Sequence, residues 1–366
     1  GYPNPDPDNV VMGGTKSYVT STELTRLGLN GTIQFKPTDQ ITSTVDGFYS
    51  DFKDDRIKRG MEVPLFWGAG VVLEPGYQTS DGLVTSGTFS NVHAIPRNVS
   101  EQRNAKLYAF GWNNRFDSDD GWHGMLDLSY SKTKRNEWIF EVWSTTNGVP
   151  DTMNFESGSQ GTSFTHNLDY SDPNLVVLSD PGGWGGTGYS NNRIVHDRIW
   201  QYRGEIAKDL DTGFISRGTF GINYTDHDKS LTPDEAFIHV TGEGPTGVAN
   251  IPTEILRDPT ELNYLGLGPV VSFDPFELLD TGVIELVNGN SQPDVQLKSF
   301  NVQEKLWTLY GQFDIRADLG AAELTGNVGV QAVHTDQQAG GFLAQNGQIL
   351  PQTGGAKYWD VMPSLN

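Results

Sequence analysis

Hydrophobic and polar residues alternate with a period of two along several segments of the chain. From Leu27 to Phe35 the odd positions are apolar or glycine, and the even positions are mostly polar. The alternation resumes from Ile41 to Tyr49, after a polar turn at residues 37–40. Because successive side chains of a β-strand point to opposite faces, this pattern predicts a hairpin with one apolar and one polar face.

Three more segments repeat this plan, and the connections between them are long. We expect hairpins at about residues 23–52, 103–134, 194–226 and 302–334, and a ninth strand that starts at about residue 357. The three further turns are short and rich in Asp and Gly, at residues 117–121, 209–213 and 318–320. The connections expected between hairpins span residues 53–102, 135–192, 227–301 and 335–356. Loops of this length are uncommon in compact soluble domains, whereas transmembrane barrels alternate short periplasmic turns with long extracellular loops.

Aromatic residues of the apolar face fall into two groups. The group near the short turns is Phe35, Trp112, Trp122, Phe214 and Phe313; the group near the long loops is Tyr49, Tyr130, Trp200, Tyr224 and Trp307. Transmembrane barrels carry aromatic girdles at both membrane interfaces. The sequence therefore predicts an all-β, antiparallel, up-and-down transmembrane β-barrel segment. A soluble β-sandwich or large β-domain is the alternative, which explains the alternation but not the two aromatic groups.

Composition narrows the function classes. The 366 residues include no cysteine, which excludes disulfides, thiolate metal sites and a cysteine nucleophile. The 25 Lys and Arg against 46 Asp and Glu give a net charge of −21, which argues against a nucleic-acid partner. No apolar run is long enough for a transmembrane helix.

Several segments resemble a known family. The run from Leu27 to Asp39, followed by Ile41 to Ser50, resembles a barrel hairpin of TonB-dependent outer-membrane receptors, in the branch often associated with carbohydrate uptake. The ending Tyr358-Trp-Asp-Val-Met-Pro-Ser-Leu-Asn366 is similar to the strand entry before that family's next hairpin. Residues 311–315 and 326–330 are similar to the repeated strand sequences of that family, and the similarity is weak in the loops.

The resemblance implies a barrel of about 22 strands, plugged by an N-terminal domain, in the outer membrane of a Gram-negative bacterium. Its partners would be outer-membrane lipid, a carbohydrate or, next, a siderophore at the extracellular face, and the inner-membrane TonB complex that contacts the plug. We expect the plug and the C-terminal strands to lie outside this chain. Open strand edges cannot face lipid, so we expect no transport by this chain alone.

Aromatic residues in the expected loops are candidate ligand contacts. Trp184 lies in the glycine-rich run 181–189, where the backbone leaves room for a ligand. Rings stack on sugar faces, and amides bind hydroxyl groups. The candidate ligand-binding residues are Trp67, Trp138, Trp143, Trp184, Tyr189, Asn191 and Asn192. The alternative is that these rings pack the loops against each other.

Charged residues on the polar face of the strands form a second candidate set. Arg203, Glu205, Arg217, Asp314 and Arg316 are expected to face the lumen of the barrel. There they would either contact the plug or pair with one another across strands.

Motifs for catalysis are missing from the sequence. It has no His-Glu-x-x-His, Gly-x-Ser-x-Gly or Gly-x-x-x-x-Gly-Lys motif, so we expect no enzyme activity and no cofactor. Two acidic segments offer ligands: Asp226-His227-Asp228 could bind a metal ion, and the segment from Asp6 to Asn9 could bind calcium. The alternative for both segments is a solvated turn. Residues 226–301 hold 13 acidic and three basic residues, which either attract cations or serve solubility. Outside transport, the alternative function is a secreted, soluble, β-rich glycan-binding or adhesion module.

Overall fold

One large antiparallel sheet dominates the structure. The computed structural model describes residues 6–210, 212–318, 320 and 322–366. The long strands are β1 (Gly14–Thr38), β2 (Ile41–Pro64), β6 (Ile95–Asp117), β7 (Trp122–Thr145), β11 (Gly188–Asp209), β12 (Ile215–Val240), β17 (Phe300–Asp318), β18 (Glu323–Gln345) and β19 (Gln348–Leu365). Each long strand pairs antiparallel with the next in this order, so the sheet is an up-and-down meander. The expected all-β, antiparallel class is confirmed.

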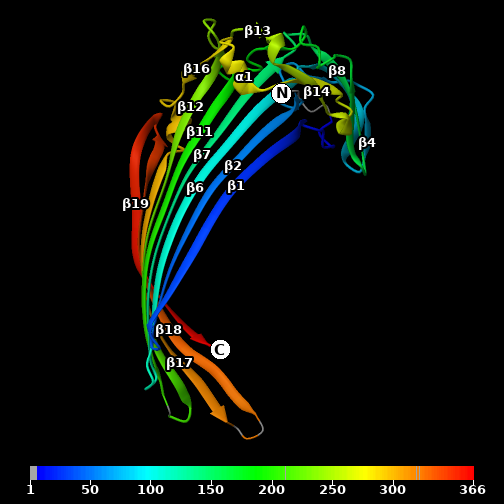
Figure 1. Cartoon of the computed structure of the whole chain (residues 1–366). Helices are drawn as coiled ribbons and strands as arrows, with labels where there is room; N and C mark the ends of the chain where they lie inside the picture. Colours follow the sequence, from blue (N-terminus) through cyan, green and yellow to red (C-terminus); the bar gives the residue numbers. More distant parts are fainter. Residues whose placement is uncertain (1–5, 211, 319, 321) are drawn as a thin grey trace.

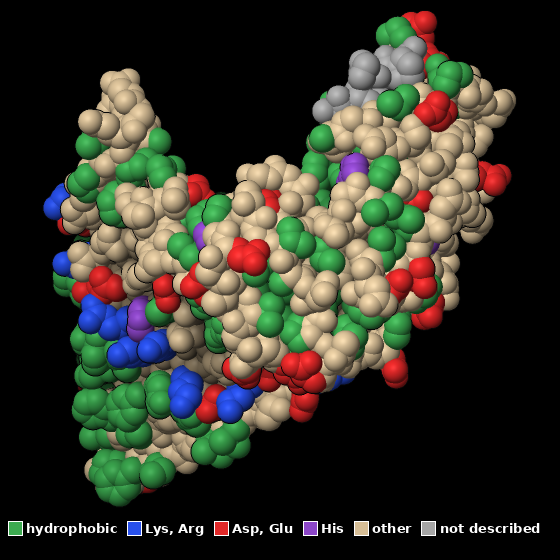
Figure 2. Space-filling model, turned by 90° about the horizontal axis from the view of Figure 1, so that it is seen from above, with side chains coloured by type: hydrophobic (Ala, Val, Ile, Leu, Met, Phe, Trp, Pro, Cys, Tyr) green, Lys and Arg blue, Asp and Glu red, His purple; other side chains and the backbone are tan. Residues whose placement is uncertain are grey.

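The sheet is curved and open. Figure 1 shows the long strands bending together into a trough, with β1 and β19 at its two edges. Seen along the strands from the loop end, the molecule is hollowed between two arms (Figure 2). The described residues therefore form no closed barrel.

The four short turns lie where the sequence predicts them. They join β1 to β2, β6 to β7, β11 to β12 and β17 to β18. Two positions of the expected turns, Asp211 and Leu319, lie outside the described residues. The register also keeps apolar residues together, because Leu29 pairs with Tyr49 and Tyr49 with Tyr108. We call this side of the sheet the apolar face, and the other the polar face.

The strands are much longer than predicted. β2 has 24 residues and β12 has 26, so the expected hairpin boundaries near residues 52 and 226 are wrong. Beyond the aromatic residues the apolar face becomes charged, for example at Lys53 and Asp55. Backbone pairing continues there without an apolar stripe, so the change in side-chain polarity marks a change of surroundings and not the end of a strand.

The fourth long connection is also different from the prediction. Residues 335–356 form the end of β18 and the start of β19, which begins at Gln348 instead of near residue 357. A tight turn at Asn346 and Gly347 joins the two strands, with φ values of 51° and 76°. Asn-Gly favours this left-handed backbone, and it is a strong short-range signal for a hairpin.

The described residues contain 19 strands instead of the expected eight or nine, because the loops contain short strands. These are β3 (Val72–Leu73), β4 (Gln78–Ser80), β5 (Leu83–Val92), β8 (Asp151–Gly158), β9 (Gly161–His166), β10 (Val177–Leu178), β13 (Ala249–Asn250), β14 (Leu256–Glu261), β15 (Pro269–Phe273) and β16 (Ile284–Asn288). The helices are α1 (Pro275–Asp280), α2 (Pro293–Gln296) and the 3-10 turns η1 (Thr253–Ile255) and η2 (Asn263–Leu265). Since β5 pairs with β8, two different loops share one small sheet.

The buried core lies at the loop end of the sheet. One hydrophobic cluster surrounds Phe89 and Tyr170, and a second surrounds Phe140 and Phe273. The loops thus form a packed layer on the upper ends of the strands (Figure 1). No helix among the described residues has the length and apolar character needed to cross a membrane.

Toward the turns, the apolar face is exposed to solvent. Ile33 is 73% exposed and Phe220 is 56% exposed. Aromatic rings run across the strands at the loop-side border of this region. Ring centroids lie 5.0 Å apart for Tyr49 and Tyr108, 4.3 Å for Tyr130 and Trp200, 4.4 Å for Tyr224 and Trp307, and 4.9 Å for His334 and Trp359. We call these residues the upper aromatic row.

Candidate functional site

Three of the predicted tryptophans meet at the loop end of the polar face. The ring of Trp184 lies 4.7 Å from that of Trp143, edge to face, and 5.6 Å from that of Trp67. Trp143 lies near the C-terminal end of β7, whereas Trp67 and Trp184 come from the loops that follow β2 and β10. We call these three residues the tryptophan cluster.

A buried arginine supports this cluster from the sheet. The guanidinium carbon of Arg97, on β6, lies 5.4 Å from the Trp184 ring centroid and 5.8 Å from that of Trp143. A guanidinium that packs against aromatic rings adds an electrostatic attraction to the apolar contact. Arg97 therefore ties the loop ring Trp184 to the strand ring Trp143.

Two carboxylates hold Arg97 in place. The guanidinium forms ion pairs with Glu62 on β2 and Glu141 on β7. Lys16 on β1 lies 3.1 Å from the other oxygen of Glu62. Arg97 is 8% exposed and Glu62 is 2% exposed, so the pair is withdrawn from water. Removal of one partner would leave a buried charge uncompensated, so we expect the loss of either charge to destabilise the support of the rings.

The loop that carries Trp184 is organised by one carboxylate. Asp180 Oδ1 accepts hydrogen bonds from the backbone N–H of Gly182 and Trp184, at 3.0 and 2.8 Å. Asp180 Oδ2 accepts from Gly185 and Gly186, at 2.9 and 3.1 Å. Partial burial alone would raise the pKa of Asp180, but the four N–H donors outweigh it and hold the pKa below its usual value.

The cluster leaves apolar and polar surface free for a ligand. Trp67 is 42% exposed, and Trp184 is partly exposed, whereas Trp143 is buried. The indole N–H of Trp143 has no hydrogen-bond partner among the described residues. Asp180 and Gly183 of the same loop also line a hollow of about 390 Å³, together with hydroxyl and amide side chains that include Thr145, Asn147, Ser179 and Thr246. The arrangement can stack a flat ligand face and bind hydroxyl groups nearby.

The other predicted ligand contacts lie elsewhere, in strands instead of loops. Trp138 on β7 packs 4.6 Å from the Phe276 ring, and its N–H donates to Ser190 at 2.9 Å. Trp138 therefore packs α1 against the sheet, and its contact with a ligand stays a prediction.

Tyr189, Asn191 and Asn192 belong to β11. The Tyr189 ring packs against Phe237 at 5.7 Å, and the Asn191 side chain accepts from Arg193 at 3.2 Å. Asn192 pairs in register with Trp138. The expectation that these residues occupy a loop beside Trp184 is therefore wrong, because β11 begins at Gly188.

The predicted charged residues of the polar face all lie on that face, and several have partners. Arg203 donates to Glu205 at 2.9 Å and to the Tyr310 hydroxyl at 3.2 Å. Arg217 donates to Asp209 at 2.7 Å. Their contact with a plug stays a prediction.

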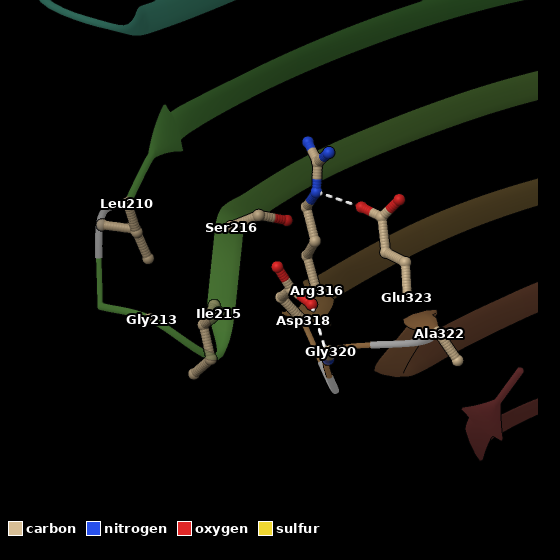
Figure 3. Close-up of a pocket in the computed structure, with 9 residues that line it drawn as sticks. All are labelled: Leu210, Gly213, Ile215, Ser216, Arg316, Asp318, Gly320, Ala322 and Glu323. Carbon is tan, nitrogen blue, oxygen red and sulfur yellow. Dashed lines mark hydrogen bonds and ion pairs between the residues drawn. The ribbon is translucent and has the colours of Figure 1, made fainter.

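Asp314 and Arg316 lie near the turn between β17 and β18. Gln312 donates to Asp314 at 2.7 Å, and Arg316 pairs with Glu323. Figure 3 shows this ion pair at the rim of a hollow of about 560 Å³ between two neighbouring turns. Asp318 also lines this hollow, where it accepts a hydrogen bond from the backbone N–H of Gly320 at 2.8 Å.

The candidate metal ligands do not converge. Asp226, His227 and Asp228 lie in β12 and not in a loop, so His227 points to the face opposite the two carboxylates. Near the N-terminus, the Asn9 side-chain amide donates to Asp6 at 2.9 Å. Among the described residues, no group of three His, Asp or Glu side chains is placed to hold a metal ion.

Sequence analysis missed Arg97, Glu62, Glu141 and Asp180. Three of these lie in strand segments that were expected to be loops, so their shared face was not apparent. Asp180 had a local signal: an Asp before a Pro-Gly-Gly run commonly accepts backbone N–H bonds in a turn.

Comparison with protein-family models, with curated proteins and with solved structures finds no match to this chain.

Proposed function

We propose that this chain is part of the β-barrel of an outer-membrane receptor that imports a nutrient, with energy supplied through the TonB complex. The observation that carries the proposal is the exposed apolar band of the sheet, bordered by aromatic residues at both ends. In a soluble protein a band of this size would need another layer to cover it. Lipid is a solvent in which the band is stable without a cover.

The dimensions of the band support this environment. From Phe214, which directly precedes β12, to Tyr224 the chain advances ten residues, or roughly 33 Å at about 3.3 Å per residue. A strand tilt of about 40° reduces this to roughly 25 Å across the membrane, the height of the apolar band of outer-membrane barrels. Charged side chains follow directly beyond Tyr224, at Asp226 and Asp228.

The tryptophan cluster supports a carbohydrate as cargo. It lies beyond the band at the loop end, on the polar face that would line the lumen. Trp67 and Trp184 expose ring surface, and hydroxyl and amide groups line the neighbouring hollow. A siderophore is the second cargo class that we consider, since aromatic rings also pack on its apolar parts.

Membrane insertion is tested by charge placement on β12. Phe220 lies in the middle of the apolar band, and its neighbour Thr219 lies on the polar face. We expect Phe220→Arg to destabilise the inserted protein by about 2–4 kcal/mol, because an arginine at the bilayer midplane costs that much. Thr219→Arg is the matched control and should change stability by less than about 1 kcal/mol. Equal effects of the two variants in lipid vesicles would contradict the proposal.

Cargo is tested by binding to the intact protein. A panel of oligosaccharides and ferric chelates is titrated against the wild type, Trp184→Ala and Trp138→Ala. Loss of one stacking ring should weaken oligosaccharide binding about tenfold in Trp184→Ala, and Trp138→Ala should bind normally. Unchanged affinity of Trp184→Ala would remove the cluster from the site.

The alternative is a secreted, soluble glycan-binding or adhesion module. It would use the same rings, but its apolar band would be covered by another part of the protein. Recovery of the intact protein from culture supernatant without detergent would favour this alternative and overturn the importer proposal.

A further inference from the structure

Five basic side chains gather on the apolar face just beyond the upper aromatic row. They come from three neighbouring strands: Lys106 from β6, Lys132 and Lys134 from β7, and His196 and Arg198 from β11. All five are exposed. We call this set the basic patch. In Figure 2, Lys and Arg side chains likewise lie beside hydrophobic ones along one flank of the molecule.

The register places basic residues directly opposite one another. Lys106 pairs with Lys134, and Lys134 pairs with His196. One step closer to the aromatic row, Lys132 pairs with Arg198. Like charges opposite each other destabilise a sheet, so this arrangement costs stability unless an anion lies between them.

Carboxylates neutralise only the margins of the patch. Lys106 lies 3.8 Å from Asp51, and Arg198 pairs with Asp228. Across the described part of the chain, no carboxylate forms an ion pair with Lys132 or Lys134. A hollow of about 430 Å³ at the patch is lined by Lys132, His196 and Arg198 and, on its β12 side, by Asp228, which already pairs with Arg198; Asp197 and Lys229 also line it. The centre of the patch thus presents unpaired positive charge in a protein of net charge −21.

The aromatic row fixes the height of the patch. Tyr108 pairs with Lys132, and Tyr130 pairs with Trp200, so the first basic residues lie two residues beyond the rings. Two residues advance a strand by roughly 7 Å. In a bilayer the aromatic girdle lies at the border of the hydrocarbon, and the polar head groups occupy the next several ångströms.

We propose that the basic patch binds the phosphate groups of lipid head groups in the outer leaflet that surrounds the protein. The inference rests on the proposed membrane location. Phosphate oxygens would lie between the opposed cations of β6, β7 and β11 and relieve their repulsion. The lipid chains would lie below, on the exposed apolar band, so one lipid molecule contacts both surfaces.

The test uses the intact protein in vesicles of phosphatidylcholine, with or without a minor fraction of diphosphoryl lipid A. The double variant K132Q/K134Q removes the unpaired charges. Lys208→Gln is the matched control, because Lys208 lies on the same face at the turn end, with its nitrogen 5.1 Å from the Trp122 ring centroid. Binding of fluorescent lipid A is measured for each protein.

We expect the wild type and Lys208→Gln to bind diphosphoryl lipid A equally. At about fivefold per lysine, the double variant should bind roughly 25-fold more weakly. Lipid A without phosphates should bind the wild type as weakly as it binds the double variant, and inorganic phosphate alone should not compete at equal concentration.

Three outcomes overturn the inference. Equal binding by the wild type and K132Q/K134Q shows that the lysines do not recognise the lipid. Competition by inorganic phosphate at equal concentration shows a site for the free anion instead of a lipid. Failure of the wild type to insert into pure phosphatidylcholine vesicles refutes the membrane location itself, and so separates failure of the proposed function from failure of the patch.

Discussion

The Asp180 loop provides a sharp test of how the tryptophan cluster is held. In Asp180→Asn one acceptor oxygen is replaced by an NH₂ group, which cannot accept a hydrogen bond. The variant therefore keeps two of the four bonds that organise residues 182–186. At about 1 kcal/mol for each lost bond, the ordered loop becomes less stable by about 2 kcal/mol, or roughly 30-fold in population.

Amide hydrogen exchange followed by mass spectrometry measures this change directly. The amides of residues 182–186 should exchange roughly 30-fold faster in Asp180→Asn, while those of the long strands keep their protection. Asp172→Asn is the control, because Asp172 uses a single oxygen to accept from Asn174, and Asn retains such an oxygen. Unchanged exchange in Asp180→Asn would refute the view that this carboxylate organises the loop.

Three further predictions concern pH, the buried ion pairs and the tight turn. Because the folded-state pKa of Asp180 lies below its usual value of 3.8, its contribution to loop stability is present at neutral pH and lost as the pH falls below about 4, which pH-dependent amide exchange can follow. Arg97→Met leaves Glu62 buried beside Lys16 alone and should cost about 3–5 kcal/mol in urea unfolding, and the double variant R97M/E62Q should recover part of this loss. Gly347 has φ of 76°, so Gly347→Val should cost about 1–2 kcal/mol and lower Tm, whereas Gly354→Ala, which meets open space, should not.

The sequence was sufficient to predict the turn-side half of the sheet, where one face is apolar and the other is polar. From Leu27 to Phe35 the alternation is clean, and β1 and β2 pair with the expected face together. Directly beyond the aromatic row both faces carry charged residues, for example Lys53 and Asp54 on β2, so alternation carries no signal there. The lower halves of the strands were therefore predicted, and the upper halves were assigned to loops.

The candidate site was harder to predict, because its contacts join distant segments. Trp67 meets Trp184 only because the loops pack against one another over two separate hydrophobic clusters. Arg97 reaches both rings through the register of β6 with β7, which is set by backbone pairing over the full length of the strands. Trp184 was identified from its glycine-rich surroundings, whereas its arginine support had no local signal.

The length of the strands determines where the protein would first meet its cargo. Arg97 lies 11 residues beyond Tyr108 on the same strand, which corresponds to roughly 36 Å along the strand and about 28 Å in height at a tilt of about 40°. In the proposed orientation, the upper parts of the long strands extend beyond the bilayer surface and hold the tryptophan cluster well above it. A polymer too thick to penetrate the layer of lipid head groups could thus be held by its end or side from the surrounding medium, before any part of it enters the trough.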